Sequence, residues 1–219
     1  MLVKVCGITR PEDAAVAVGL GARALGFLFW PGSPRFIEPV RARAIARTLP
    51  PFVTPVGLFV NQPIDEVNRV AAEVGLGAVQ LHGDESVEYA ERVERPVVKA
   101  LSVGGAVDMA DVDRWPARVV LLLDAHDPER RGGTGRMVDW AQAAAVAARR
   151  RTLLAGGLRP DNVAEAIARV RPFGIDVSSG VEAAPGVKDH ERLRALFAAV
   201  SRLRADHEAV AFTNDAPRS

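Results

Sequence analysis

Short apolar runs alternate with stretches of helical periodicity along nearly the whole chain. The runs are rich in β-branched or other apolar residues and have the length of buried strands. Between them, apolar residues recur at helical spacing, as at Val67, Val70 and Val74. The predicted strands span residues 2–6, 24–29, 54–60, 78–82, 96–101, 118–123, 152–155 and 174–177.

This repeated order of strand and helix predicts an α/β fold with a parallel sheet that is buried on both faces. The 219 residues leave about 27 for each unit, which suits a single-domain (β/α)8 TIM barrel with a closed sheet over residues 1–205. The main alternative is a doubly wound open sheet. That fold would usually have fewer units and a GxGxxG turn after the first strand, where this chain has CGIT. Residues 206–219 lose the periodicity and are predicted to form a disordered tail.

Polar residues mark the predicted helix starts. Thr9 and Glu12 have the spacing of a capping box. Asn61 and Asp189 each precede a predicted helix and carry an oxygen that can cap it.

Composition and charge narrow the function classes. Lys and Arg number 28 against 27 Asp and Glu, so the net charge of +1 gives no reason to expect nucleic acid or a membrane surface as a partner. One cysteine excludes an intrachain disulfide and suits a reducing compartment. The N-terminal apolar run is too short for a secretory signal, and no run approaches the ~20 residues of a membrane span. We therefore expect a cytoplasmic protein, and the four histidines lack the spacing of metal ligands.

Two glycine-bearing turns follow the last two predicted strands, which is where phosphate-binding barrels place their phosphate site. AGGLRPDN (155–162) contains Gly156 and Gly157, and DVSSGVE (176–182) contains Ser179 and Gly180. Glycines let several backbone N–H groups approach one phosphate closely. Plain turn glycines are the alternative, but two such turns on adjacent strands favour a phosphate site.

Cys6 ends the first predicted strand and Asp124 follows the sixth, and the two are candidates for a base and an acid. A lone strand cysteine is more often a small buried apolar residue. A free thiol has a pKa of ~8.5, so the site would have to favour the thiolate before Cys6 acts as a base. A carboxyl at the rim of an apolar strand is partly desolvated and can hold a proton for general acid catalysis. An acid and a base on two sides of one carbon skeleton suit a proton-shifting isomerisation.

Other polar residues follow the strands and are predicted to contact the substrate. Arg35 lies in a Pro-flanked loop, where it could clamp a carboxylate bidentately, although a solvated loop arginine is the commoner case. Gln80, His82 and Asp176 complete the predicted substrate contacts. Loops 30–36 and 127–136 are hypothesised to form a mobile lid.

The chain resembles the phosphoribosylanthranilate isomerase family of tryptophan biosynthesis over about residues 2–204. The matching segments are KVCGITRPEDA (4–14), GFLFWPGSPR (26–35), VGLFVN (56–61), VQLHGDE (79–85), LLLDA (121–125), GGTG (132–135), LAGGLRPDNV (154–163) and IDVSSGVEAAPGVKD (175–189). One departure is Val138, where the family pattern leads us to expect phenylalanine.

The resemblance implies an Amadori rearrangement of N-(5-phosphoribosyl)anthranilate without a cofactor. It makes Asp124 the acid that opens the furanose ring, Cys6 the base that removes the C2 proton, and Arg35 the clamp for the anthranilate carboxylate. The phosphate would lie against Gly157, Ser179 and Gly180 with their neighbours. We expect a phosphorylated small-molecule substrate and a monomer or homodimer.

Three other functions remain open at this point. An indoleglycerol phosphate synthase would need a catalytic lysine at a strand end, whereas Lys4 points into the barrel below the mouth. An aspartate pair on the first and fifth strands would suit a histidine-pathway sugar isomerase, whereas the first strand here ends in Cys6. A non-catalytic phosphosugar-binding barrel could keep the glycine turns without Cys6 and Asp124.

Overall fold

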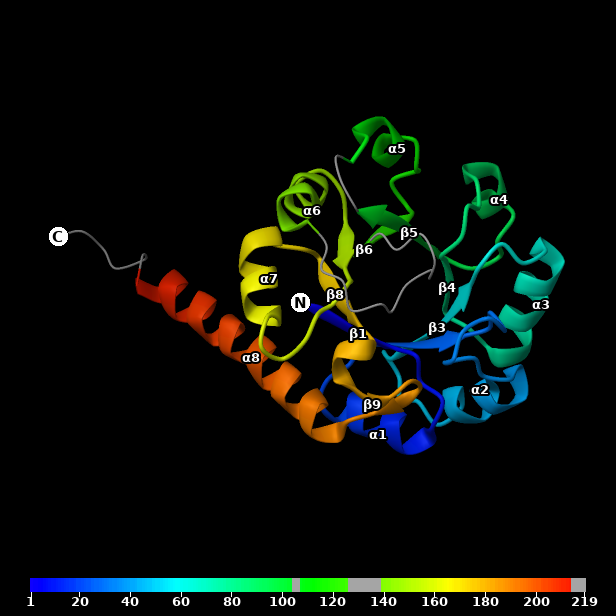
Figure 1. Cartoon of the computed structure of the whole chain (residues 1–219), viewed down its shortest axis with the longest axis horizontal. Helices are drawn as coiled ribbons and strands as arrows, with labels where there is room; N and C mark the ends of the chain where they lie inside the picture. The colour runs from blue at the N-terminus through cyan, green and yellow to red at the C-terminus, as the bar shows by residue number, and fades with distance from the viewer. Residues whose placement is uncertain (104–106, 126–138, 214–219) are drawn as a thin grey trace.

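The chain folds into a closed barrel of parallel strands, as predicted. The computed structural model describes residues 1–103, 107–125 and 139–213, with only the backbone described for residues 125 and 204–213. The strands β1 to β8 are hydrogen-bonded in chain order, and β8 pairs with β1 to close the barrel (Figure 1). The rival open sheet is excluded, because an open sheet has two edge strands and lacks this last pairing.

The strand boundaries agree with the prediction to within two residues at each end. Apolar runs locate strands well here because a parallel barrel strand is covered on both faces. The strands are β1 Leu2–Cys6, β2 Ala24–Leu28, β3 Thr54–Phe59, β4 Ala78–Leu81, β5 Val97–Val103, β6 Val120–Ala125, β7 Thr152–Leu154 and β8 Gly174–Val177.

Helices follow the strands and surround the barrel (Figure 1). After β8 the chain inserts a 3-10 helix, Ser179–Val181, and a short antiparallel hairpin of β9 Glu182–Ala184 and β10 Val187–Lys188. The helices are α1 Pro11–Gly19, α2 Pro39–Ala46, α3 Ile64–Val74, α4 Val87–Glu91, α5 Met109–Asp113, α6 Trp140–Ala147, α7 Val163–Val170 and α8 His190–Thr213. Helix α8 runs into the stretch for which we expected a tail, and a domain boundary at residue 205 stays a prediction.

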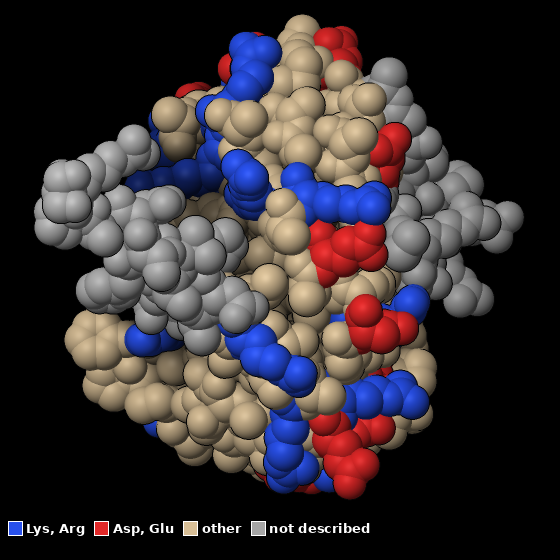
Figure 2. All heavy atoms as spheres, turned by 90° about the vertical axis from the view of Figure 1, so that its left-hand side faces the viewer, with Lys and Arg blue, Asp and Glu red and all other residues tan. Residues whose placement is uncertain are grey.

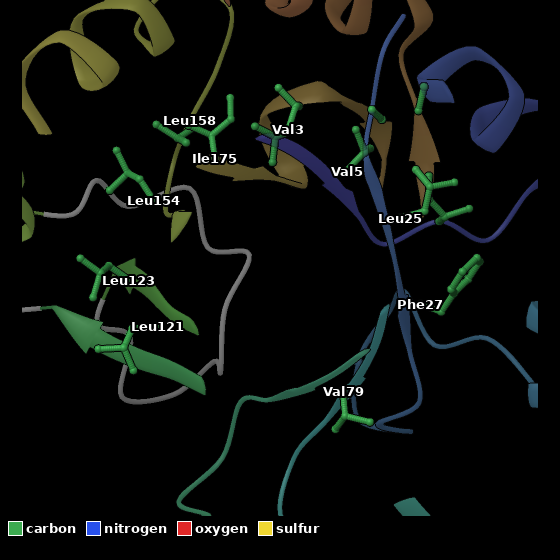
Figure 3. Close-up of a cluster of buried hydrophobic side chains, with 14 of the residues drawn as sticks. Val3, Val5, Leu25, Phe27, Val79, Leu121, Leu123, Leu154, Leu158 and Ile175 are labelled. Carbon is green, nitrogen blue, oxygen red and sulfur yellow. The ribbon is translucent and has the colours of Figure 1, made fainter. Parts of the chain in front are cut away.

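Alternating strand positions build two separate cores. Odd-numbered strand residues such as Val3, Leu25 and Leu121 belong to the large core cluster that also contains the buried residues of the helices. Figure 3 shows members of this cluster from several strands around the barrel, among them Val79 and Ile175. This layer holds the helices on the sheet and leaves the alternate strand positions, even-numbered in most strands but Leu153 in β7, for the interior.

The barrel interior is apolar in smaller clusters and polar toward the carboxyl ends of the strands. One interior cluster contains Ala100, Leu122 and Leu153, and another contains Ala24 and Val56. The polar interior positions are Lys4, Gln80, Asp124 and Asp176, all of them buried. Buried polar side chains usually have hydrogen-bond partners. The carboxyl ends of the strands are also where barrels of this kind have their functional sites.

Two of the three predicted helix caps are wrong. The hydroxyl of Thr9 donates to the carbonyl of Gly186 and is thereby taken up by the hairpin, so Arg10 stands at the start of α1 without a side-chain cap. Asn61 bonds with Asp84 instead, and α3 begins after Pro63. Asp189 does cap α8, accepting from the backbone N–H groups of the first turn.

The surface carries both signs of charge. On the face in Figure 2, acidic and basic side chains lie beside one another toward the right-hand side. Among the helices of the described residues, none has both the length and the apolar character needed to cross a membrane.

Candidate active site

A cavity of about 510 Å³ opens where the carboxyl ends of the strands and the following loops meet. That volume is within the range of ~300–1,000 Å³ that is usual for small-ligand sites. All of the site residues predicted from the sequence lie together in its wall. They are Cys6, Arg35, Gln80, His82, Asp124, Gly156, Gly157, Asp176, Ser179 and Gly180.

Cys6 is the last residue of β1 and is 4 % exposed. The adjacent strand leaves room for its sulfur because residue 26 is glycine, and a Cβ added to Gly26 would lie 2.6 Å from Sγ. Burial raises the pKa of the Cys6 thiol, while the ammonium of Lys4 acts in the opposite direction. The thiol therefore depends on nearby positive charge if it is to ionise near neutral pH.

Asp124 lies inside β6, before Ala125, and not just after the strand as we predicted. Its Oδ2 is 3.3 Å from Nε2 of His82, and Nδ1 of His82 is 3.0 Å from Nε2 of Gln80. With the amide of Gln80 as donor, Nδ1 accepts and the imidazole proton is on Nε2, facing the carboxyl of Asp124. Two of the predicted substrate contacts therefore also orient the predicted acid.

Arg35 is a buried member of an ion cluster, not a solvated loop arginine. Its Nε donates to both oxygens of Glu182, at 2.9 and 3.1 Å, and its Nη2 donates to Oε2 at 2.7 Å. Lys188 lies on the other side of that carboxylate, with Nζ 2.8 Å from Oε1. Burial raises the pKa of Glu182, but the Arg35 hydrogen bond and the Lys188 charge outweigh it and lower the pKa overall.

The glycine turn after β7 has a backbone geometry that only glycine adopts readily, and it packs against the turn after β8. Gly156 and Gly157 have φ angles of 76° and 65°, in the left-handed region. A Cβ on Gly180 would lie 1.9 Å from the carbonyl oxygen of Leu158, so the two turns pack directly on each other. Asn162 fixes the first turn, because its Nδ2 donates to the carbonyl of Gly157 at 2.9 Å.

Asp176 lies on β8 beneath the turn that follows it. Its Oδ2 accepts a hydrogen bond of 2.9 Å from Nζ of Lys4, and the two residues are direct neighbours in the β1–β8 register. Its Oδ1 is buried and has no hydrogen-bond partner among the described residues. Oε1 of Gln80 is likewise buried and has no hydrogen-bond partner among the described residues.

Sequence reasoning did not assign Glu182 and Lys188 to the site. Both are buried charged residues of the β9–β10 hairpin, at 6 % and 3 % exposure. The signal available in the sequence was a glutamate and a lysine close to the second glycine turn, but nothing in their spacing indicates burial. Trp30 also lines the cavity and was not predicted.

Some predictions fall outside the described residues. The second half of the hypothesised lid, loop 127–136, and the departure at Val138 lie there, so the lid stays a hypothesis. Within the described residues, no three His, Cys, Asp or Glu side chains form a group that could hold a metal ion.

The chain is similar in sequence and in fold to known isomerases. A family model described as N-(5′-phosphoribosyl)anthranilate (PRA) isomerase matches residues 3–199. The N-(5′-phosphoribosyl)anthranilate isomerase of Citrifermentans bemidjiense is 52% identical over 201 residues, covering 92% of this chain and 97% of that protein.

Solved structures agree with the sequence comparison. The phosphoribosyl anthranilate isomerase of Thermus thermophilus superposes with a TM-score of 0.86 at 48% identity, over 93% of this chain and all of that one (100%). A phosphoribosyl anthranilate isomerase in complex with reduced 1-(o-carboxyphenylamino)-1-deoxyribulose 5-phosphate has a TM-score of 0.82 at 42% identity, over 92% of this chain and 100% of its own. The chain therefore belongs to the N-(5′-phosphoribosyl)anthranilate isomerase family of aldose–ketose isomerases.

Proposed function

We propose that this chain catalyses the Amadori rearrangement of N-(5′-phosphoribosyl)anthranilate to 1-(2-carboxyphenylamino)-1-deoxyribulose 5-phosphate in tryptophan biosynthesis. The observation that carries the proposal is one cavity lined by a thiol, a carboxyl, an arginine and two glycine turns. These groups match, one to one, the base, the acid, the carboxylate and the phosphate that the reaction involves. The reaction moves hydrogen within one molecule, so it requires no external oxidant or cofactor.

Asp124 begins the reaction as the general acid. It gives its proton to the furanose ring oxygen, the C1–O bond breaks, and the lone pair of the anthranilate nitrogen forms the C1=N bond of a Schiff base. The imidazole of His82 orients the carboxyl, with Nε2 at 3.3 Å from Oδ2. A carboxyl held at one position can deliver its proton to one oxygen of the bound sugar.

Cys6 completes the reaction as the general base. Its thiolate removes the C2 proton, and the C–H electrons form a C1=C2 bond while the C=N electrons return to nitrogen. The resulting enolamine then takes up a proton at C1 and releases the proton of its C2 hydroxyl, which gives the ketose. Cys6 on β1 and Asp124 on β6 both line the cavity, so a sugar between them meets one group at each reacting position.

Gln80 and Asp176 are proposed to accept hydrogen bonds from substrate hydroxyls, with His82 beside them. The proposal rests on Oε1 of Gln80 and Oδ1 of Asp176, which are buried without a partner among the described residues. A buried acceptor left unpaired costs about 1–3 kcal/mol. Sugar hydroxyls entering the cavity would remove that cost in the bound state.

The phosphate is proposed to bind the turns at Gly156, Gly157, Ser179 and Gly180. Left-handed glycines and the close packing of the two turns let backbone N–H groups converge, as an oxyanion requires. Inorganic phosphate should therefore compete with substrate, and the competition should weaken when either turn is altered.

The guanidinium of Arg35 is proposed to bind the anthranilate carboxylate. Glu182 occupies Nε and Nη2, and within the described part of the chain Nη1 has no hydrogen-bond partner. Glu182 and Lys188 fix the plane of the guanidinium, so a carboxylate meets a donor whose orientation is already set.

We expect the protein to act in the cytoplasm, as a monomer or a homodimer. A reducing compartment would keep the buried Cys6 a free thiol, as the proposed base requires. The phosphorylated substrate is then a small molecule drawn from the same compartment.

The substrate is tested by turnover. The purified protein should convert N-(5′-phosphoribosyl)anthranilate with loss of its fluorescence and should leave the aminoaldose of the histidine pathway unchanged. Turnover of neither compound would contradict the proposal. Turnover of the histidine-pathway compound alone would assign the other isomerase activity.

The carboxylate contact is tested by pairing a variant with a substrate analogue. Arg35→Lys should raise KM for the natural substrate, because lysine lacks the planar fork of donors. For the analogue that carries aniline in place of anthranilate, wild type and variant should have similar KM values. An equal rise in KM for both compounds would show that Arg35 does not bind the carboxylate.

A further inference from the structure

An ion pair lies inside the barrel, below the cavity. Nζ of Lys4 is 2.9 Å from Oδ2 of Asp176, and their side chains are 1 % and 7 % exposed. Asp176 lines the cavity, whereas Lys4 is not part of its wall. Lys4 therefore lies beneath the site without contacting what binds there.

Packing alone does not account for this pair. Other interior positions hold leucine, as at Leu122 and Leu153. Taking two charges out of water costs several kcal/mol each, and replacing a buried ion pair with apolar side chains of similar volume is often neutral or stabilising. An electrostatic effect of the Lys4 ammonium on neighbouring groups explains the pair better than packing does.

The nearest reactive group is the thiol of Cys6. Lys4 and Cys6 are alternate residues of β1, so both side chains point into the barrel. Both end groups lie against Gly26, where an added Cβ would be 2.6 Å from Sγ of Cys6 and 3.1 Å from Nζ of Lys4. Sulfur and nitrogen are thus within the ~4–6 Å over which an opposite charge favours the ionised form.

Several other charges face this part of the barrel. Asp176 on β8 acts against ionisation of Cys6, and Lys188 on β10 acts in favour of it. The charge of Asp124 on β6 raises the pKa of Asp176, and the charge of His82 after β4 lowers it. Among these charges Lys4 has the largest effect on the Cys6 thiol, and the pKa of Lys4 is raised because Asp176 and Cys6 outweigh the effect of burial.

We propose that Lys4, held by Asp176, is a positioning residue that stabilises the thiolate of Cys6 and so prepares the base for proton abstraction. The inference rests on the proposed function, in which Cys6 is that base. Asp176 has two roles in this arrangement: Oδ2 holds the ammonium, and Oδ1 is the proposed acceptor for a substrate hydroxyl. The ammonium remains protonated throughout and transfers no proton.

The test uses the fact that Cys6 is the single cysteine of the chain. The rate of alkylation by iodoacetamide against pH reports ionisation of Cys6 directly, in the absence of substrate. Lys4→Met should lower the alkylation rate at neutral pH about tenfold or more and move the midpoint of the profile upward. Lys4→Met/Asp176→Asn should move it in the same direction by less, because it also removes the opposing carboxylate.

A matched control comes from a second buried lysine. Nζ of Lys99 lies 2.8 Å from Oε2 of Glu85, with side-chain exposures of 5 % and 2 %, and neither residue lines the cavity. Lys99→Met should lower stability as Lys4→Met does but leave the alkylation profile unchanged. If Lys99→Met shifts the profile as much as Lys4→Met, the effect is structural and the proposal is wrong.

Kinetics separates this inference from the proposed function. Lys4→Met should lower kcat most at the acidic end of the pH profile and leave KM nearly unchanged. If the single variant does not fold, the double variant serves in its place. An unchanged alkylation profile would then overturn the role of Lys4 but leave the proposed function standing. Full activity of Cys6→Ser would instead overturn the proposed mechanism, in which Cys6 is the base, whatever the alkylation result.

Discussion

Replacing Glu182 with glutamine would remove the negative charge that lies between two buried cations. The side chains of Arg35 and Lys188 are 10 % and 0 % exposed, and both bond to this one carboxylate. Glutamine has nearly the same size, but it offers one acceptor oxygen and turns an NH2 group toward donors. The substitution therefore leaves positive charge buried without a counter-ion.

The burial of these ion pairs sets the expected loss in the free energy of unfolding. Breaking a buried ion pair by removing one partner costs about 3–5 kcal/mol. Glu182→Gln should lower the free energy of unfolding by that amount, measured by urea denaturation with tryptophan fluorescence. Glu165→Gln is the matched control, because its pair with Arg169 is exposed (55 % and 64 %) and exposed pairs contribute at most about 1 kcal/mol.

The loss should depend on pH. The pKa of Glu182 is lowered in the folded state, so its contribution is fully present above the pKa of an unfolded glutamate, ~4.3, and is lost as pH falls through the lower folded value. The difference between wild type and Glu182→Gln should therefore shrink on acidification. If Glu182→Gln lowers the free energy of unfolding at pH 7 no more than Glu165→Gln does, Glu182 does not stabilise the fold as a buried counter-ion.

Two further predictions concern separate parts of the fold. Burial raises the pKa of Tyr89 to about 12, so the wild type should lose stability as pH rises from ~10 through that value. Tyr89→Phe, which lacks the hydroxyl bonded to the carbonyl of Gln62, should show no such loss in alkaline unfolding experiments. Gly180→Ala should weaken phosphate binding at least about tenfold by calorimetry, because its Cβ would lie 1.9 Å from the Leu158 carbonyl oxygen, and Gly19→Ala, with no atom within 4 Å, should not. Equal phosphate affinity in both glycine variants would exclude the two turns as the binding site.

The fold was predictable because its signal is local and repeated. Each barrel strand is buried on both faces and therefore forms an apolar run, and each run is followed by helical periodicity. The carboxyl-end rule then brought Cys6, Asp124 and the glycine turns into one site without any knowledge of contacts.

The ion pairs of the site were not predictable in the same way. Arg35 and Glu182 are 147 positions apart in the sequence, and Lys4 and Asp176 are 172 apart. No local pattern says which buried charges will meet, so Glu182 was missed and Lys4 was noticed only as a residue below the mouth. The predicted cap at Thr9 failed for the same reason, since its hydroxyl bonds to distant Gly186.

The most direct test of the central claim is kcat for N-(5′-phosphoribosyl)anthranilate, measured by fluorescence loss in Cys6→Ser and Asp124→Asn beside the wild type. General acid and base groups typically contribute ~10²–10⁴-fold each. We expect each variant to lose activity within that range while folding normally. A loss below about tenfold in both folded variants would contradict the assignment of Cys6 as base and Asp124 as acid.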